Sequence, residues 1–104
     1  MTVLIVDDNA AIRRLIRRAI AHLADEVYEC ADGADALAAY SYYRPDFVFM
    51  DIRMPRTDGL EATRQIIRAH PSARVVILTD YDEEQLKTAA LEAGAEGYLS
   101  LIHI

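Results

Sequence analysis

The sequence is poor in the residues that disulfides, zinc sites and flexible linkers require. One cysteine, Cys30, is present among 104 residues, which excludes an internal disulfide and a multi-cysteine zinc site. Four glycines and three prolines are scattered along the chain, with no low-complexity linker and no internal repeat. No apolar run approaches the roughly 18 residues that a membrane-spanning helix needs, and the N-terminus is unlike a signal peptide. We therefore expect a soluble, cytoplasmic protein.

Positive charge is also scarce. With 11 lysines and arginines against 17 aspartates and glutamates, the formal net charge is -6 and the sequence pI is about 4.9. Phosphate backbones and anionic membranes are bound by basic surfaces, so we expect no direct nucleic-acid or membrane binding by this segment. A chain of this length can form one domain with a modest core. We expect residues 1–104 to be that single domain.

Short apolar runs alternate with amphipathic segments along the chain. The runs with the length and composition of buried strands are residues 3–6, 27–30, 46–50 and 75–78, and a fifth that begins at Tyr98. Between them, apolar residues recur at the spacing of helices with one buried face, over residues 12–23, 34–43, 58–70 and 82–94. The residues suited to cap these helices are Asn9, Asp58 and Asp82 at N-termini and Gly94 at the last C-terminus.

The order of these elements is βαβαβαβαβ, with short connections. Parallel strands joined in this way need right-handed crossovers, which place helices on both faces of a doubly wound sheet. We therefore expect an α/β fold with five parallel strands in the flavodoxin-like order 2-1-3-4-5. In that order the topological switch point lies between the first and third strands, at their carboxyl ends.

Acidic residues follow the two strands that flank this switch point. Asp7 and Asp8 come directly after residues 3–6, and Asp51 comes directly after residues 46–50. Three carboxylates held close together repel one another unless a cation or a proton compensates them. Because Mg2+ prefers hard oxygen ligands, we expect Asp7, Asp8 and Asp51 to form a Mg2+ site.

Asp51 is the candidate for covalent chemistry at this edge of the sheet. A carboxylate beside Mg2+ can attack a phosphoryl group, because the metal screens the incoming negative charge. The product is an aspartyl phosphate. Thr79, directly after residues 75–78, would bring a hydroxyl to the same edge and donate a hydrogen bond to a phosphoryl oxygen.

Four motifs follow one another in order on the expected strands and loops. They are Val6-Asp7-Asp8, then Met50-Asp51-Ile52-Arg53-Met54-Pro55 with Asp58-Gly59, then Leu78-Thr79, and finally Gly94-Ala95-Glu96-Gly97-Tyr98-Leu99. Together they resemble the acidic pair, phosphoacceptor strand and loop, switch strand and last strand of two-component response regulator receiver domains, the CheY-like family. The resemblance covers residues 2–98 and is strongest to receivers attached to a LuxR- or NarL-type DNA-binding output.

The resemblance implies a role for each matched residue. Asp51 accepts a phosphoryl group from a sensor histidine kinase or a phosphotransfer protein, and Thr79 with the switch aromatic Tyr98 relays the change. The residues assigned to Mg2+ are Asp7, Asp8, Asp51 and, through its backbone carbonyl, Arg53. The family is one of switches rather than enzymes, with self-phosphotransfer and slow autodephosphorylation at most. Such a switch controls an output domain in transcription regulation and can pair as a receiver homodimer.

The C-terminal residues depart from the family pattern. Family members carry a lysine that pairs with the phosphoryl group where this chain has Leu101, and they continue into a fifth helix that is missing here. Residues 99–104 resemble the translation of a transposon adapter used in sequencing libraries, so we expect a C-terminally truncated receiver with an adapter scar at its end. Without the lysine, a pseudo-receiver that binds proteins but is not phosphorylated remains an alternative.

Two other function classes fit the pattern less well. A phosphohydrolase with an aspartyl nucleophile needs a second aspartate two residues on, where this chain has Arg53. A nucleotide-binding domain needs a glycine-rich turn after the first strand, whereas Asp7 and Asp8 would repel phosphates. One further feature has two interpretations, a solvated helix face or a docking surface for the phosphodonor: the arginines at positions 13, 14, 17 and 18.

Overall fold

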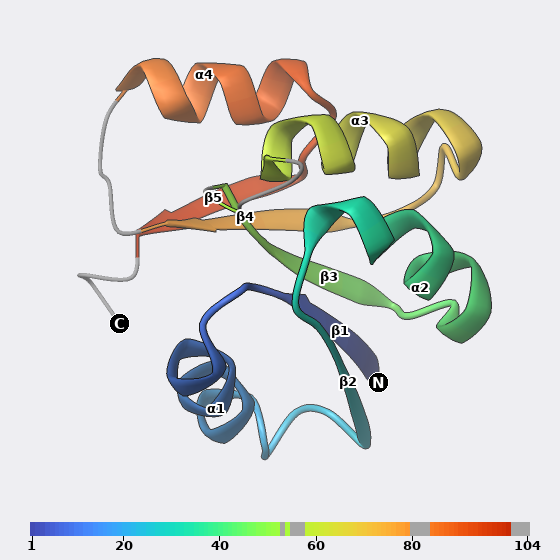
Figure 1. Cartoon of the computed structure of the whole chain (residues 1–104), viewed down its shortest axis with the longest axis vertical. Coiled ribbons are helices and arrows are strands. Elements are labelled where there is room, and N and C mark those ends of the chain that lie inside the picture. Colours follow the sequence, from blue (N-terminus) through green and yellow to red (C-terminus); the bar gives the residue numbers. More distant parts are fainter. Residues whose placement is uncertain (53, 55–57, 80–83, 101–104) are drawn as a thin grey trace.

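The computed structural model describes residues 1–52, 54, 58–79 and 84–100 of the chain, in which strands and helices alternate (Figure 1). The strands are β1 (Thr2–Val6), β2 (Glu26–Cys30), β3 (Phe47–Asp51), β4 (Val75–Thr79) and β5 (Gly97–Ser100). The helices are α1 (Ala10–Ala19), the 3-10 turn η1 (Gly33–Asp35), α2 (Ala36–Tyr43), α3 (Gly59–Ala69) and α4 (Glu84–Glu92). None of the helices in these ranges is long and apolar enough to cross a membrane.

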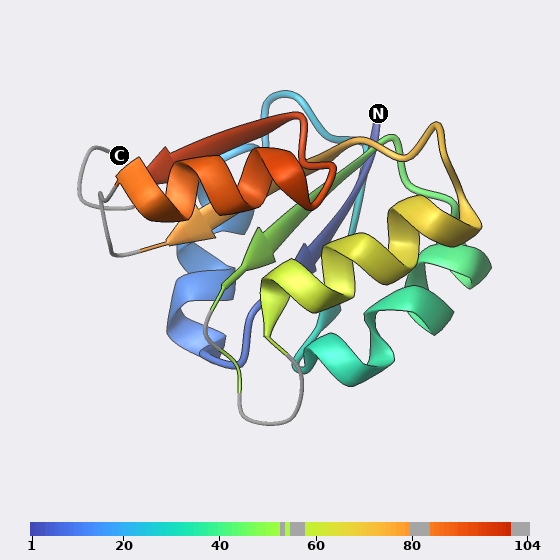
Figure 2. The same ribbon diagram turned by 90° about the horizontal axis from the view of Figure 1, so that it is seen from above.

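All five strands pair in parallel, in the order β2-β1-β3-β4-β5. This order confirms the predicted doubly wound, flavodoxin-like sheet. Figure 2 shows the strands running in one direction, so that their carboxyl ends lie at the same edge of the sheet. Because β1 pairs directly with β3, the switch point lies where the sequence predicted it.

Helices cover the sheet on both faces, with α2, α3 and α4 on one side and α1 on the other (Figure 1). The first face carries the larger core, which includes Ile66 of α3 and Ile77 of β4. On the second face, Ile16 of α1 packs against β1. Residues 3–6 are all 0% exposed. This double burial explains why β1 is an unbroken apolar run rather than an alternating one.

Within the described residues, α1 is alone on its face of the sheet and leaves an apolar groove beside β5. The groove holds about 170 Å³ and is lined by Leu15, Ile16, Ala19, Ile20, Phe49, Leu78 and Leu99. Leu99 and Ser100 complete β5, and no helix follows them among the described residues. The remaining residues of the predicted adapter scar, 101–104, lie outside that part of the chain.

Helix α1 is shorter than the apolar pattern predicted. The expected buried positions ran to Leu23, but the helix ends at Ala19, and Leu15 and Leu23 are 46% and 56% exposed. The chain then turns, and the N–H of Asp25 donates to the carbonyl of Met1 at 2.8 Å. The helix has to end early because β2 must begin beside the N-terminal end of β1.

The segment predicted as one helix over residues 34–43 is divided into two parts. The side chain of Asp32 accepts the N–H of Ala34 at 2.8 Å and caps the 3-10 turn, and the α-helix begins only at Ala36. An aspartate placed before a turn competes with the helix for backbone N–H groups, which explains the later start.

The predicted helix caps are confirmed wherever the structure describes them. Asn9 Oδ1 accepts the N–H of Ala11 at 2.9 Å, and Asp58 Oδ1 accepts the N–H of Glu61 at 2.8 Å. Gly94 follows α4 with a φ of 103°, the left-handed conformation that ends helices. The predicted cap Asp82 lies outside the described residues.

The start of α3 lies directly against the end of β3. The N–H of Gly59 donates to the carbonyl of Ile52 at 2.8 Å. A Cβ added to Gly59 would stand 1.9 Å from the carbonyl oxygen of Asp51, so there is no room for a side chain at this position. The start of α3 therefore packs against the backbone of Asp51, the last residue of β3.

Replacing Gly59→Ala should lower the free energy of unfolding by about 1–3 kcal/mol, because α3 or the backbone of Asp51 must move to admit the methyl group. The matched control is Gly97→Ala, since a Cβ at Gly97 has no atom within 4 Å. Its effect should stay within about 0.5 kcal/mol. Urea unfolding followed by circular dichroism measures both, and equal effects would contradict the close approach at Gly59.

Replacing Leu4→Ala should cost about 2–5 kcal/mol, because Leu4 is 0% exposed and its removal leaves a cavity at the centre of the sheet. Leu91→Ala deletes the same atoms from a side chain that is 58% exposed and should change stability by no more than about 0.5 kcal/mol. The same unfolding measurement compares the two. Similar losses would mean that β1 is not the centre of the core.

Candidate metal site at the carboxyl edge of the sheet

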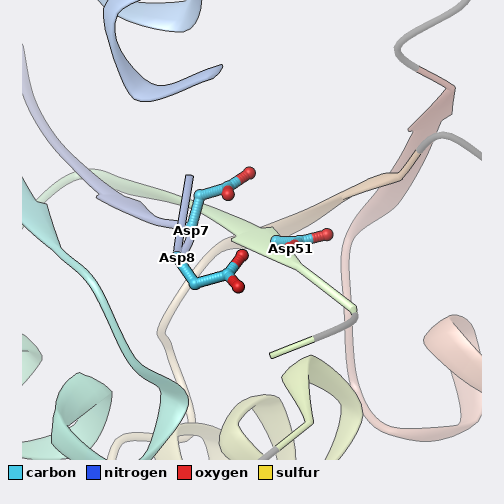
Figure 3. Close-up of side chains that lie close together, drawn as sticks. All are labelled: Asp7, Asp8 and Asp51. Carbon is cyan, nitrogen blue, oxygen red and sulfur yellow. The ribbon is translucent and has the colours of Figure 1, made fainter. Parts of the chain in front are cut away.

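Three carboxylates meet at the edge of the sheet where β1 and β3 end. Asp7 and Asp8 follow β1, and Asp51 is the last residue of β3. The register pairs Val6 with Met50, so Asp7 and Asp51 occupy the next positions on adjacent strands. Each side chain offers an oxygen within 4.8 Å of the other two. Figure 3 shows the three side chains extending from the strand ends toward the same side.

Asp7 is the innermost of the three carboxylates, with 3% of its surface exposed. Its N–H donates to the carbonyl of Cys30 at 3.0 Å, and its Oδ1 accepts the N–H of Asn9 at 2.8 Å. Asp51 is half-buried and Asp8 is exposed. The site therefore combines one buried carboxylate, Asp7, with two carboxylates that solvent and an incoming group can reach.

The donor set fits Mg2+. Ligand oxygens of an octahedral Mg2+ ion lie about 3.0 Å apart when adjacent and about 4.2 Å apart when opposite, so oxygens within 4.8 Å of one another are near enough for side-chain rotations to bring them around one ion. In the described part of the chain the cluster consists of carboxylates alone, without histidine or cysteine, which favours a hard cation over zinc. The same three negative charges repel one another when no cation is bound.

Thr79 lies on β4, the strand next to β3, and Tyr98 lies on β5, the strand beyond it. The register pairs Asp51 with Leu78, so Thr79 extends one position further at the same edge and is 1% exposed. Tyr98 pairs with Ile77, two positions before the end of β4, and is half-buried. The ammonium of Lys87 on α4 lies 5.9 Å from the centre of the Tyr98 ring. Tyr98 therefore connects β5 to the underside of α4.

Two predicted features of the site lie outside the described residues. One is the backbone carbonyl of Arg53, predicted as a metal ligand, and the other is the replacement of the family lysine by Leu101. What the structure does describe is the start of α3, where Gly59 packs against the carbonyl of Asp51. The sequence matched Gly59 to a motif without predicting this contact, because the contact joins the end of a strand to the start of a helix.

A cation that the sequence did not assign to the site lies behind Asp7. Nη1 of Arg13 donates to the Asp7 carbonyl at 2.6 Å, and Nε of Arg13 donates to Glu29 at 2.7 Å. The hydrogen bond from Arg13, helped by one from Arg17, holds the pKa of Glu29 below its usual value against the opposing effect of burial. The interpretation of these arginines as a merely solvated face is therefore wrong for Arg13. Arg14 is exposed, as that interpretation requires.

Local sequence carries no signal for this contact. Arg13 and Glu29 are 16 residues apart and lie on different elements, so no helical or strand periodicity relates them. Only the packing of α1 beside the end of β2 brings them together.

Comparison with known proteins agrees with this architecture. The response regulator receiver domain family matches residues 3–100 of the chain. The transcriptional regulatory protein DegU of Brevibacillus brevis is 38% identical over 100 residues, which are 93% of this chain and 42% of DegU. This chain therefore spans less than half the length of that relative.

Solved structures give the same result. A two-component response regulator of the LuxR family from Aurantimonas sp. SI85-9A1 has a TM-score of 0.89 and 35% identity, over 95% of this chain and 72% of that one. A chain of the CheX-CheY-BeF3-Mg2+ complex from Borrelia burgdorferi has a TM-score of 0.86 and 30% identity, over 96% of this chain and 77% of that one. The chain therefore belongs to the response regulator receiver domains, the signalling modules of two-component systems, as its sequence motifs implied.

Proposed function

We propose that this chain is a phosphorylatable switch in which Asp51 accepts a phosphoryl group from a sensor histidine kinase or a phosphotransfer protein. The observation that carries the proposal is the convergence of Asp7, Asp8 and Asp51 within 4.8 Å at the switch point of the sheet. The proposed ligands of Mg2+ are these three side chains and the backbone carbonyl of Arg53. The reaction would take place in the cytoplasm, where a histidine kinase presents its phosphorylated imidazole.

Asp51 is the proposed nucleophile because of its place in the cluster. It is the last residue of β3 and is half-buried, so an incoming group can reach it, whereas Asp7 is only 3% exposed. An oxygen of Asp51 attacks phosphorus while the bond from phosphorus to the imidazole nitrogen breaks and its electron pair stays on that nitrogen. The imidazole, protonated on its other nitrogen, leaves as a neutral histidine, and the product is an aspartyl phosphate. When bound, Mg2+ neutralises charge on the phosphoryl oxygens as they approach the carboxylates.

Thr79 is the proposed link from the phosphoryl group to the rest of the domain. Its hydroxyl lies at the same edge as Asp51, one strand away, and can donate to a phosphoryl oxygen. Movement of Thr79 toward Asp51 would open space beside β5 for the ring of Tyr98, which belongs to the same face of the sheet. The gain of this hydrogen bond in one state shifts the equilibrium between two arrangements of α4 and β5.

The surface formed by α4 and β5 is the proposed output of the switch. It would meet a second receiver or an output domain, and the transcriptional regulator DegU supports an output in transcription regulation. The charge of -6 agrees with DNA binding by a segment other than this one. The alternative is a pseudo-receiver that binds proteins without being phosphorylated, and phosphorylation of Asp51 itself separates the two.

Incubation of the chain with acetyl phosphate and Mg2+ should add one phosphoryl group, measured by intact mass. Asp51→Asn should abolish the gain, because the amide oxygen is too weak a nucleophile, and omission of Mg2+ should reduce it at least tenfold. Asp46→Asn, just before the other end of β3, is the matched control and should react like the unmodified chain. No gain in a chain with a native circular dichroism spectrum would favour the pseudo-receiver, with Leu101→Lys as the next variant.

Thr79→Ala should uncouple the switch from the reaction. We expect phosphorylation of Asp51 to change by less than about threefold, because Thr79 acts on the phosphoryl group after transfer. The phosphorylation-dependent shift of the Tyr98 ring resonances in NMR spectra should disappear in Thr79→Ala and persist in Thr79→Ser, which keeps the hydroxyl. An unchanged Tyr98 shift in the alanine variant would exclude Thr79 as the link.

A further inference from the structure

The guanidinium of Arg13 bridges the backbone of Asp7, directly after β1, and the neighbouring strand β2. Nη1 donates to the carbonyl of Asp7 at 2.6 Å, while Nε donates to Oε1 of Glu29 at 2.7 Å. The side chains of Arg13 and Glu29 are only 17% and 29% exposed, so solvent competes less for these bonds than it does for a surface pair. Arg13 therefore connects the backbone of a candidate metal ligand to a fixed point outside the site.

Glu29 is itself fixed from its other side. Its Oε2 accepts from Nε and Nη2 of Arg17 at 3.1 and 2.8 Å, and Nη2 of Arg17 also donates to the carbonyl of Val27 at 3.1 Å. Both carboxylate oxygens of Glu29 thus have arginine partners, and Arg17 is tied to the backbone of β2. Two-point contacts of this kind define the orientation of a planar guanidinium, not only its position.

The hydrogen bond from Arg13 adds to two others that hold Asp7. Its N–H donates to the Cys30 carbonyl at 3.0 Å, its carbonyl accepts from Arg13, and its Oδ1 accepts the N–H of Asn9 at 2.8 Å. The first contact binds Asp7 directly to β2 at Cys30, and the second binds it to β2 through Arg13 and Glu29. Without Arg13, the peptide that follows Asp7 could rotate, and it carries Asp8, the second carboxylate of the cluster, with it.

We propose that Arg13 is a positioning residue for the metal site, oriented by Glu29, and that it sets the affinity of the Asp7–Asp8–Asp51 cluster for Mg2+. The inference rests on the proposed function, since it takes this cluster to be the Mg2+ site. Residues that orient metal ligands without touching the metal typically change metal affinity about 10- to 100-fold when removed. Arg13 has this relation to Asp7, through the backbone carbonyl rather than the carboxylate.

The charge of Arg13 acts in the opposite direction from its positioning role. A positive charge close to three carboxylates reduces the attraction of the site for a divalent cation, so its removal would by itself strengthen Mg2+ binding. Loss of positioning would weaken binding, because the cluster would have to be ordered by the ion. The sign of the change in affinity therefore separates the two roles.

The test is calorimetric titration of the 104-residue chain with Mg2+, at fixed pH and ionic strength, for the unmodified protein and for Arg13→Gln. We expect Arg13→Gln to weaken Mg2+ binding about tenfold. Arg14→Gln removes the same charge from the next residue, which is exposed, and should leave the affinity unchanged or slightly tighter. Arg17→Gln keeps the contact of Arg13 with Asp7 and should therefore lower the affinity for Mg2+ by less than Arg13→Gln does.

The outcomes distinguish the inference from the function on which it rests. Mg2+ binding by the unmodified chain, with equal or tighter binding by folded Arg13→Gln, would overturn the positioning role and leave the proposed site intact. Absence of Mg2+ binding by the folded, unmodified chain would overturn both. If Arg13→Gln does not fold, Arg13→Lys decides, because an ammonium keeps the charge but not the two-nitrogen fork. Affinity equal to that of the unmodified chain would then reject the inference, and weaker binding would support it.

Discussion

The parallel pairing of β1 with β3 is the interaction on which the rest of the site depends. Its register sets Val6 beside Met50, and the next residue on each strand is an aspartate. A slip of one residue would transfer every side chain of β1 to the opposite face of the sheet and would shift Asp7 relative to Asp51. Leu4 and Val6 pack in the larger core and Val3 and Ile5 pack in the smaller core beside α1, so such a slip would require both cores to be repacked. The apolar core therefore defines the relative positions of the acidic side chains, although no apolar residue takes part in the chemistry.

The fold holds its carboxylates in an arrangement that they would not adopt alone. Like charges within 4.8 Å oppose one another, and the strands, the Asn9 N–H and the close approach of Gly59 keep them in place. A site ordered in advance can respond to the arrival of a cation and a phosphoryl group with little rearrangement of its own. In the proposed function, the response would then be passed to β4 and β5, the strands that carry Thr79 and Tyr98.

The two faces of the sheet contribute to the site in different ways. The face with α2, α3 and α4 contains the larger core and receives both Thr79 and Tyr98, the residues through which the proposed switch would reach α4. The face with α1 contains the smaller core and an apolar groove. That face nevertheless supports the site, because α1 carries Arg13 to the back of Asp7. Helix α1 thus both covers this face of the sheet and contacts the backbone of a proposed metal ligand.

The sequence alone determined the element order, the strand order, the caps at Asn9 and Asp58, and the acidic residues at two strand ends. The element order, the caps and the strand-end acids follow from patterns among residues within a few positions of one another. The strand order follows from the short parallel crossovers, which few sheet topologies allow. Only the tertiary structure decided that α1 ends at Ala19 and that Arg13 joins Glu29 to the carbonyl of Asp7. Those outcomes depend on where β2 lies against β1 and α1, and a contact between segments 16 residues apart has no period in the sequence to reveal it.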